Sequence, residues 1–156
     1  MSELTITRQI SIPADLDGYI LLKCPYCKEF FKLKVSDIKA EEYYQTWCPS
    51  CGLIADNYHT DEVYDLAENM AMNIFNDLIF DELNKMSKKV NRNNKYIKLE
   101  TGKKPKALPE NPIKSRIDLL EIQTYKCCNK KVKISPLVKF TVSYCPFCGR
   151  DYDEYR

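Results

Sequence analysis

Apolar and charged residues alternate around the first cysteine pair of the chain. In the segment KEFFKLKVSD, three apolar residues alternate with two lysines: Phe31, Leu33 and Val35 against Lys32 and Lys34. A period of two is typical of a β-strand, and the preceding segment GYILLK also predicts one. We therefore expect Cys24 and Cys27 to lie in a tight turn between two strands.

The same alternation recurs before the last cysteine pair. Apolar or aromatic residues alternate there with polar ones: Val138, Phe140, Val142 and Tyr144 against Lys139, Thr141 and Ser143. This pattern predicts a strand over residues 138–144 that leads directly into Cys145 and Cys148.

A helical period replaces the alternation between residues 60 and 90. Thr60 or Asp61 provides an N-cap, acidic residues follow in the first turn, and lysines end the segment, as a helix dipole favours. The expected helix has roughly 28 residues. One broad face is apolar, with Phe80 and Leu83 outside it: Val63, Ala67, Met70, Ala71, Ile74, Phe75, Leu78 and Ile79. Such a face is expected to cover the ribbon sheet, and the part of this long helix that extends beyond the sheet is available to a protein partner or to a second copy of the chain.

The segment after the helix predicts a connector. Prolines and a glycine interrupt it, so at most a short strand is expected at Tyr96–Leu99. Its charge differs sharply from that of its surroundings. Residues 1–84 contain 6 Lys/Arg and 15 Asp/Glu (net −9), residues 85–116 contain 11 and 2 (net +9), and residues 117–156 contain 7 and 5 (net +2).

A run of lysines is either solvated chain or a set of contacts to phosphate groups. The connector leads into a C-terminal segment in which lysines are interleaved with Tyr125 and Phe140, and this favours phosphate contacts. The predicted nucleic-acid-binding residues are Lys95, Lys98, Lys103, Lys104, Lys106, Lys114, Arg116, Lys130, Lys131 and Lys133.

The first four cysteines have the spacing of a metal site. Cys24 and Cys27 are followed after 20 residues by Cys48 and Cys51, which gives C-x2-C-x20-C-x2-C. The motif CPYC also occurs in glutaredoxins, but there a helix follows it, whereas the pattern here predicts a strand. Two residues between cysteines allow one turn to direct both sulfurs at a metal, with backbone N–H groups offsetting the thiolate charge. Gly52 suits the positive φ that such a turn often needs after its second cysteine.

These residues resemble the zinc-ribbon, or rubredoxin-like, superfamily over residues 19 to about 55. The resemblance implies an antiparallel ribbon around a structural zinc ion. Disulfides are disfavoured, because no signal peptide is apparent at the start of the sequence and a reducing compartment favours metal binding.

The last four cysteines form a less regular set. Cys145 and Cys148 have the usual spacing, but Cys127 and Cys128 are adjacent, which leaves Lys130 where a second cysteine is expected. Both can reach one ion only if the chain turns sharply there, and Asn129 tolerates such a turn.

A C-x2-C pair with two adjacent cysteines resembles the zinc site of a small RNA polymerase subunit of archaea and eukaryotes. The resemblance is limited to these four residues and implies that all four bind one zinc. The alternatives are three cysteines plus a distant ligand, or one free thiol. His59, the only histidine, is expected to be an ordinary loop residue.

Together these patterns predict an α+β protein: an N-terminal strand and zinc ribbon in residues 1–58, a long helix in 59–90, a basic connector in 91–116 and a second ribbon in 117–156. Two zinc ions per chain are expected, and no catalytic set is apparent. The expected function is that of a non-enzymatic, nucleic-acid-associated accessory factor in the cytoplasm. The alternative is a protein adaptor, or a subunit of a larger complex, that docks through the helix. No membrane segment is expected.

Overall fold

The computed structural model describes residues 5–41, 44–94, 96–114, 117 and 119–153. The chain divides into two compact units. The first, here called the cysteine unit, consists of Met1–Val63 and Ile113–Arg156. The second, here called the helical unit, consists of Tyr64–Pro112. The mixed α+β class expected from the sequence is confirmed.

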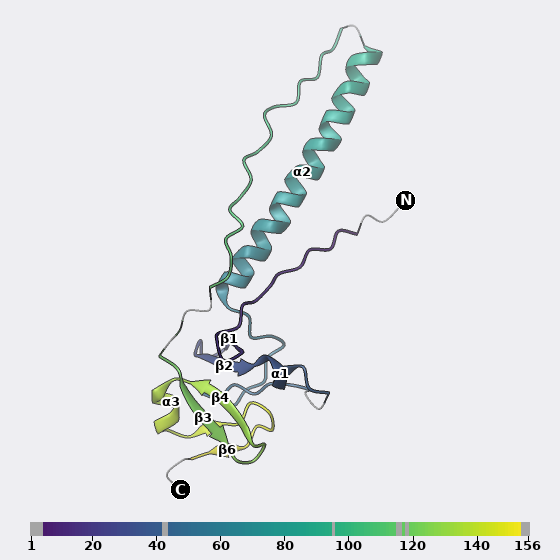
Figure 1. Cartoon of the computed structure of the whole chain (residues 1–156). Helices are drawn as coiled ribbons and strands as arrows, with labels where there is room; N and C mark the ends of the chain where they lie inside the picture. The colour runs from purple at the N-terminus through teal and green to yellow at the C-terminus, as the bar shows by residue number, and fades with distance from the viewer. Residues whose placement is uncertain (1–4, 42–43, 95, 115–116, 118, 154–156) are drawn as a thin grey trace. The chain divides into compact units, whose positions relative to one another are not determined.

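The cysteine unit contains one four-stranded antiparallel sheet made of two hairpins (Figure 1). The strand order is β1-β2-β4-β3, with β1 at Tyr19–Lys23, β2 at Phe30–Lys34, β3 at Glu121–Tyr125 and β4 at Lys130–Ile134. Each hairpin contains the turn expected around a cysteine pair. The hairpins join through β2 and β4, where Lys32 is the partner of Lys133. The two cysteine modules therefore share a sheet, which the sequence patterns did not predict.

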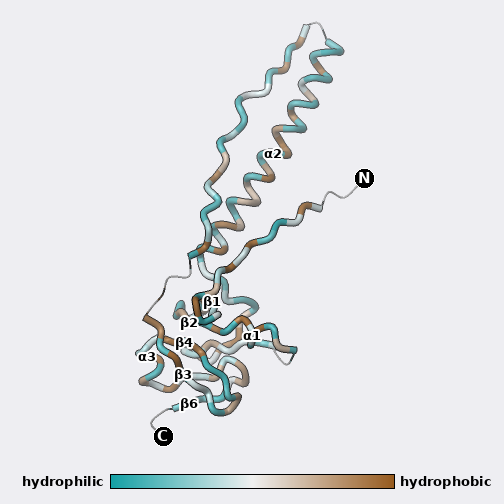
Figure 2. The backbone as a smooth tube through the Cα atoms, in the orientation of Figure 1, coloured by the Kyte–Doolittle hydropathy of each residue, from teal (hydrophilic) through white to brown (hydrophobic). Residues whose placement is uncertain are grey.

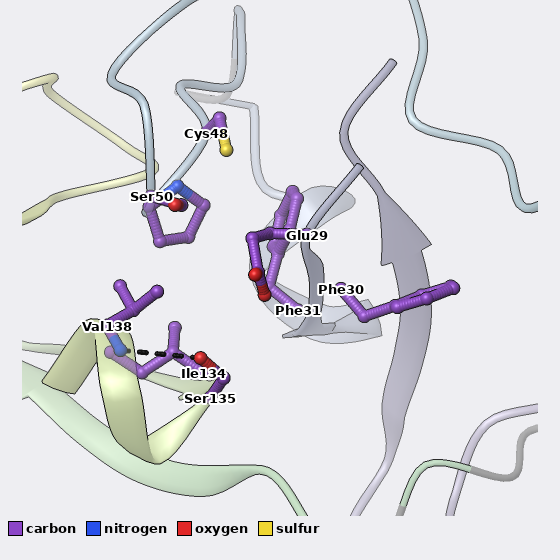
Figure 3. Close-up of a pocket in the computed structure, with 9 residues that line it drawn as sticks. Glu29, Phe30, Phe31, Cys48, Ser50, Ile134, Ser135 and Val138 are labelled. Atoms are coloured by element: carbon purple, nitrogen blue, oxygen red, sulfur yellow. Dashed lines mark hydrogen bonds between the residues drawn. The ribbon is translucent and has the colours of Figure 1, made fainter. Parts of the chain in front are cut away.

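A single-turn helix follows each hairpin, α1 at Val35–Ile38 and α3 at Pro136–Phe140. The strand predicted over residues 138–144 is therefore wrong in its first half, and only β5 (Ser143–Tyr144) forms, paired with β6 (Asp151–Tyr152). The Ser135 hydroxyl accepts a hydrogen bond from the Val138 backbone N–H at 3.3 Å, which caps the helix at its start (Figure 3). Pro136 then occupies an early helical position, where its fixed φ suits the helix.

The core of the cysteine unit draws on both hairpins. Its fully buried side chains include Phe31 and Leu33 from β2 and Val132 and Ile134 from β4. The Phe31 ring packs edge-on against Tyr58, with centroids 5.4 Å apart. The two hairpins therefore share one hydrophobic core.

The helical unit consists of most of α2 (Asp61–Asn93) and of an extended segment, residues 96–112, that returns beside the helix (Figure 1). This segment is here called the arm. The helix starts at Asp61, as expected, and is longer than expected, at 33 residues. The arm is fastened to it by side-chain amides. Asn91 Oδ1 accepts from the Leu99 N–H at 2.7 Å and Asn91 Nδ2 donates to the Leu99 carbonyl at 2.9 Å.

Two expected strands do not form. Residues 96–99 form no strand: Tyr96 lies in a bend, and the Asn91 side chain takes both backbone hydrogen bonds at Leu99. Residues 5–13 form no strand either, and Ala14 makes only an isolated bridge with Ile20. Among the described residues, no helix has the length and apolar content needed to cross a membrane.

Candidate metal centres

Site 1 consists of Cys24, Cys27, Cys48 and Cys51, whose sulfur atoms all lie within 4.8 Å of one another. The Cys24–Cys51 sulfurs are 3.8 Å apart and the Cys27–Cys48 sulfurs 3.6 Å apart. A tetrahedral zinc with Zn–S bonds of about 2.3 Å has sulfur–sulfur edges of about 3.8 Å. The cluster therefore has the size and the donor set of a structural zinc site.

The backbone of the turns explains how the sulfurs converge. In three turns the residue after the second cysteine donates its N–H to the carbonyl of the first: Lys28 to Cys24 at 3.0 Å, Gly52 to Cys48 at 2.9 Å and Gly149 to Cys145 at 2.8 Å. The residue after the last cysteine of every pair has a positive φ: Lys28 65°, Gly52 70°, Asn129 51° and Gly149 70°. The turn expected at Asn129 is thus confirmed, and all four turns share one conformation at that residue.

Backbone N–H groups also point at the first cysteine of the regular turns. Burial raises the pKa of Cys24, but hydrogen bonds from the backbone of Cys27 and Tyr26 outweigh it and lower the pKa below its ordinary value. At Cys48 burial dominates and raises the pKa, although the N–H groups of Cys51 and Ser50 act in the opposite direction. Such donors favour thiolates, which are the form that binds zinc.

Site 2 consists of Cys127, Cys128, Cys145 and Cys148, again with all sulfurs within 4.8 Å of one another. The Cys127 and Cys148 sulfurs are 3.5 Å apart, close to a tetrahedral edge. Both adjacent cysteines therefore lie in the cluster. Site 2 is more open than site 1, because Cys127 is exposed and Cys145 alone of the four is buried.

In the irregular turn of site 2, Tyr125 occupies the position of the first cysteine of a regular turn. The expectation that the missing cysteine is the second one, at Lys130, is therefore wrong. Cys128 precedes the positive-φ residue Asn129, as Cys27 precedes Lys28. The Cys128 N–H donates to the Tyr125 carbonyl at 3.4 Å. Tyr125 therefore corresponds to the first cysteine of a regular turn. Its ring is fully buried, and Cys127, from inside the turn, brings the fourth sulfur to the site.

The second cysteine turns of the two sites bind each other reciprocally. The Trp47 N–H donates to the Pro146 carbonyl at 3.0 Å, and the Tyr144 N–H donates to the Pro49 carbonyl at 2.9 Å. Each aromatic residue immediately precedes a Cys-Pro-x-Cys-Gly motif.

The aromatic rings of this reciprocal pair cover the glycines of the opposite turns. A Cβ atom added to Gly149 would lie 2.6 Å from the Trp47 ring, and one added to Gly52 would lie 3.0 Å from the Tyr144 ring. Both sites are therefore built into one interface.

Asp15 fastens the two hairpins on the sheet. Its Oδ1 accepts from the N–H groups of Asp17 at 3.1 Å and Tyr19 at 2.9 Å. Its Oδ2 accepts from Lys32 at 3.3 Å and from Lys133 at 2.9 Å. Burial raises the pKa of Asp15, but hydrogen bonds from Lys133, Tyr19 and Lys32 more than offset it, and the pKa falls to about 2.

The lysines predicted to bind nucleic acid separate into two groups. Three have carboxylate partners: Lys104 with Asp77 at 2.9 Å, Lys130 with Asp37 at 2.7 Å, and Lys133 with both Asp15 and Asp17. Within the described part of the chain, the others are exposed without an ion pair: Lys98, Lys103, Lys106, Lys114 and Lys131. Lys95 and Arg116 lie outside the described residues.

His59 is exposed just before α2 and belongs to neither cysteine cluster. It lies in a loop, as expected. The site residues that the sequence patterns missed are Asp15, Tyr125 and the Trp47–Tyr144 pair. A usable signal existed for the last, because an aromatic residue precedes Cys-Pro-x-Cys-Gly twice in the chain.

In comparisons with protein-family models, curated proteins and solved structures, no match to this chain was found. The assignment therefore depends on the cysteine geometry: the chain has two four-cysteine sites whose donor atoms and dimensions suit zinc.

Proposed function

We propose that this chain is a structural zinc protein that binds the phosphate backbone of nucleic acid through the lysines of its arm. The observation that carries the proposal is how the arm is held. Its backbone is fastened to α2 along much of its length, while most of its lysine side chains remain exposed.

The fastening uses polar side chains of α2 on the arm backbone. Asn73 repeats the arrangement of Asn91: its Oδ1 accepts from the Leu108 N–H at 2.7 Å, and its Nδ2 donates to the Leu108 carbonyl at 3.0 Å. Asn69 donates to the Pro109 carbonyl at 3.0 Å. An extended chain held in this way presents cations at fixed positions, which reduces the conformational entropy lost when they meet a phosphate chain.

The proposed role for zinc is structural. Four thiolates fill a tetrahedral shell and leave no position for the activated water that a catalytic zinc needs. Zinc in either site would stabilise the shared sheet, and the arm would supply the contacts to nucleic acid. Contacts of this kind neutralise phosphates without reading base sequence.

The test compares two triple variants of the full chain. Lys98→Gln/Lys103→Gln/Lys106→Gln removes arm cations, and Lys28→Gln/Lys34→Gln/Lys39→Gln removes three exposed lysines near site 1 as a matched control. Fluorescence anisotropy with labelled duplex DNA and single-stranded RNA gives log K against log salt. The arm variant should bind more weakly to every sequence, and its slope should flatten by about 0.7–0.9 for each phosphate that is no longer neutralised. If the wild type does not bind at ~50 mM salt, the proposal fails.

A protein adaptor is the second candidate. It is favoured by the apolar side chains that α2 exposes, including Phe75 and Ile79. The absorbance ratio at 260 and 280 nm of the purified untagged protein separates the two functions, because an adaptor should not carry nucleic acid through purification.

A further inference from the structure

The apolar stripe of α2 consists of five exposed side chains on one face of the helix. Their exposed fractions are Met72 42%, Phe75 55%, Ile79 43%, Leu83 41% and Met86 50%. Figure 2 shows hydrophobic positions recurring along the length of α2. The spacing of three, four, four and three residues keeps these side chains in one row along the helix.

The arm does not cover this stripe. The residues of α2 that bind the arm are Asn69, Asn73, Asp77, Asn84, Ser87 and Asn91. With 3.6 residues per turn, their row lies about 120° around the helix from the apolar stripe. Within the helical unit, one face of α2 therefore holds the arm and another presents a contiguous apolar surface.

The charges of α2 change sign along its length. Residues 61–77 contain five acidic and no basic side chains, whereas residues 85–92 contain four basic and no acidic side chains. A parallel pair of such helices would bring like charges together at both ends, and an antiparallel pair would bring opposite charges together.

We propose that two copies of this chain pack their α2 helices antiparallel through the apolar stripe, with the twofold axis at Ile79. In this register Met72 of each copy lies opposite Met86 of the other, and Phe75 lies opposite Leu83. The stripe is symmetric about Ile79, with Met at both positions seven residues away. Side chains of similar size therefore lie opposite each other along the whole contact.

The register also pairs charges beside the stripe. Glu68 lies 11 residues before Ile79 and Lys89 lies 10 residues after it, so each Glu68 comes next to Lys89 of the other copy. On the helical wheel Glu68 lies about 20° and Lys89 about 80° from the centre of the stripe, both in the same direction, and an antiparallel pair brings these equivalent flanks together. Two such ion pairs form in each dimer.

The first experiment measures the mass of the zinc-loaded full chain by light scattering after size exclusion, from about 10 to 200 µM. The wild type should be a dimer. Ile79→Glu places two carboxylates at the axis and should raise the dissociation constant at least ~100-fold. Leu137→Glu changes a more exposed apolar side chain of the cysteine unit and should leave the dimer intact. Zinc content and helicity by circular dichroism, measured on each variant, show that it is folded.

The second experiment tests orientation. Glu68→Lys alone and Lys89→Glu alone should each weaken the dimer by about tenfold, and the double variant should recover most of the affinity. Recovery is specific to the antiparallel register, since a parallel pair leaves Glu68 and Lys89 about 30 Å apart along the helix axis. A wild type that is monomeric at 200 µM, a dimer that survives Ile79→Glu, or a double variant that shows no recovery would each overturn the proposal. A monomer would leave the stripe for a different protein partner.

Discussion

Lys32 and Lys133 hold the same place in the two cysteine modules and are partners of each other across β2 and β4. Each lies five residues after the last cysteine of its hairpin, Cys27 in one case and Cys128 in the other. The pairing of equivalent residues means that a local twofold relation connects the hairpins. The reciprocal bonds of Trp47 and Tyr144 extend the same relation to the second turns. The two metal sites therefore belong to one folding unit.

The symmetry places two ammonium groups close together, and the Asp15 carboxylate offsets their repulsion. Two lysines face each other on the sheet, and the Lys32 side chain is only 3% exposed. Asp15→Asn removes the carboxylate that binds both, and it should destabilise the protein by about 3 kcal/mol because a buried ammonium loses its counter-ion. The free energy of unfolding from denaturant titration of the zinc-loaded protein measures the effect.

Asp17→Asn is the matched control for Asp15→Asn. Its carboxylate also binds Lys133 but is 66% exposed, so the loss of stability should be under about 1 kcal/mol. The folded pKa of Asp15 is about 2, below its usual 3.8, so its contribution is complete above pH 3.8 and is lost only as the pH falls towards 2. The difference between wild type and Asp15→Asn should therefore be equal at pH 6 and pH 8. A difference that shrinks between these values would contradict the assigned role.

The close contact between Gly149 and Trp47 makes a second prediction. Gly149 has a φ of 70°, and an added Cβ would lie 2.6 Å from the Trp47 ring. Gly149→Ala should thus lower the free energy of unfolding by about 2 kcal/mol or more, from backbone strain and displacement of the ring. Gly102→Ala is the control, because nothing lies within 4 Å of its Cβ position, and it should change stability by less than about 0.5 kcal/mol. Equal effects would show that Trp47 does not pack there.

Site 1 was predictable because its ligands are local. A turn and a strand pair set the positions of Cys24 and Cys27, and both leave a clear period of two in the sequence. The start of α2 was predictable for a similar reason, since its capping and charge signals lie within one turn.

The joining of the hairpins was not predictable from local patterns. It depends on Lys32 meeting Lys133, 101 residues later, and on an aspartate in an irregular segment. The strand expected at residues 138–144 failed because a capping serine and a proline outweighed the alternation of side chains. The sequence predicted a connector but not its attachment to α2, because a periodic row of polar side chains on a helix gives no apolar signal.

The correspondence of Tyr125 with Cys24 can be tested by moving a ligand. Cys127→Ser alone should leave about one zinc per chain, because site 2 loses a thiolate. Adding Tyr125→Cys should restore two zinc ions, since it places the thiolate where a regular turn has its first cysteine. Tyr125→Ser with Cys127→Ser is the matched control, with the same reduction of side-chain volume, and it should stay at one. Failure of the cysteine variant to regain zinc in native mass spectrometry would disprove the correspondence.

The difference in exposure between the sites predicts an order of zinc release. Site 1 has two buried thiols, Cys24 and Cys48, whereas site 2 has one, so a chelator should reach site 2 first. Release followed with a colorimetric chelator should show two phases of one zinc each. Cys128→Ser should remove the fast phase and spare the slow one, while His59→Ala should preserve both. Disappearance of the slow phase in Cys128→Ser would reverse the order.

The most direct test of two zinc sites in one folding unit is native mass spectrometry of the full chain, with tryptophan fluorescence followed during chelation. The expected result is two zinc ions per chain, eight thiols that react with an alkylating reagent only after zinc removal, and disappearance of the folded Trp47 signal as the metal leaves. One zinc ion or none, iron in place of zinc, or a metal-free chain that keeps its native fluorescence would contradict a pair of zinc sites in one folding unit.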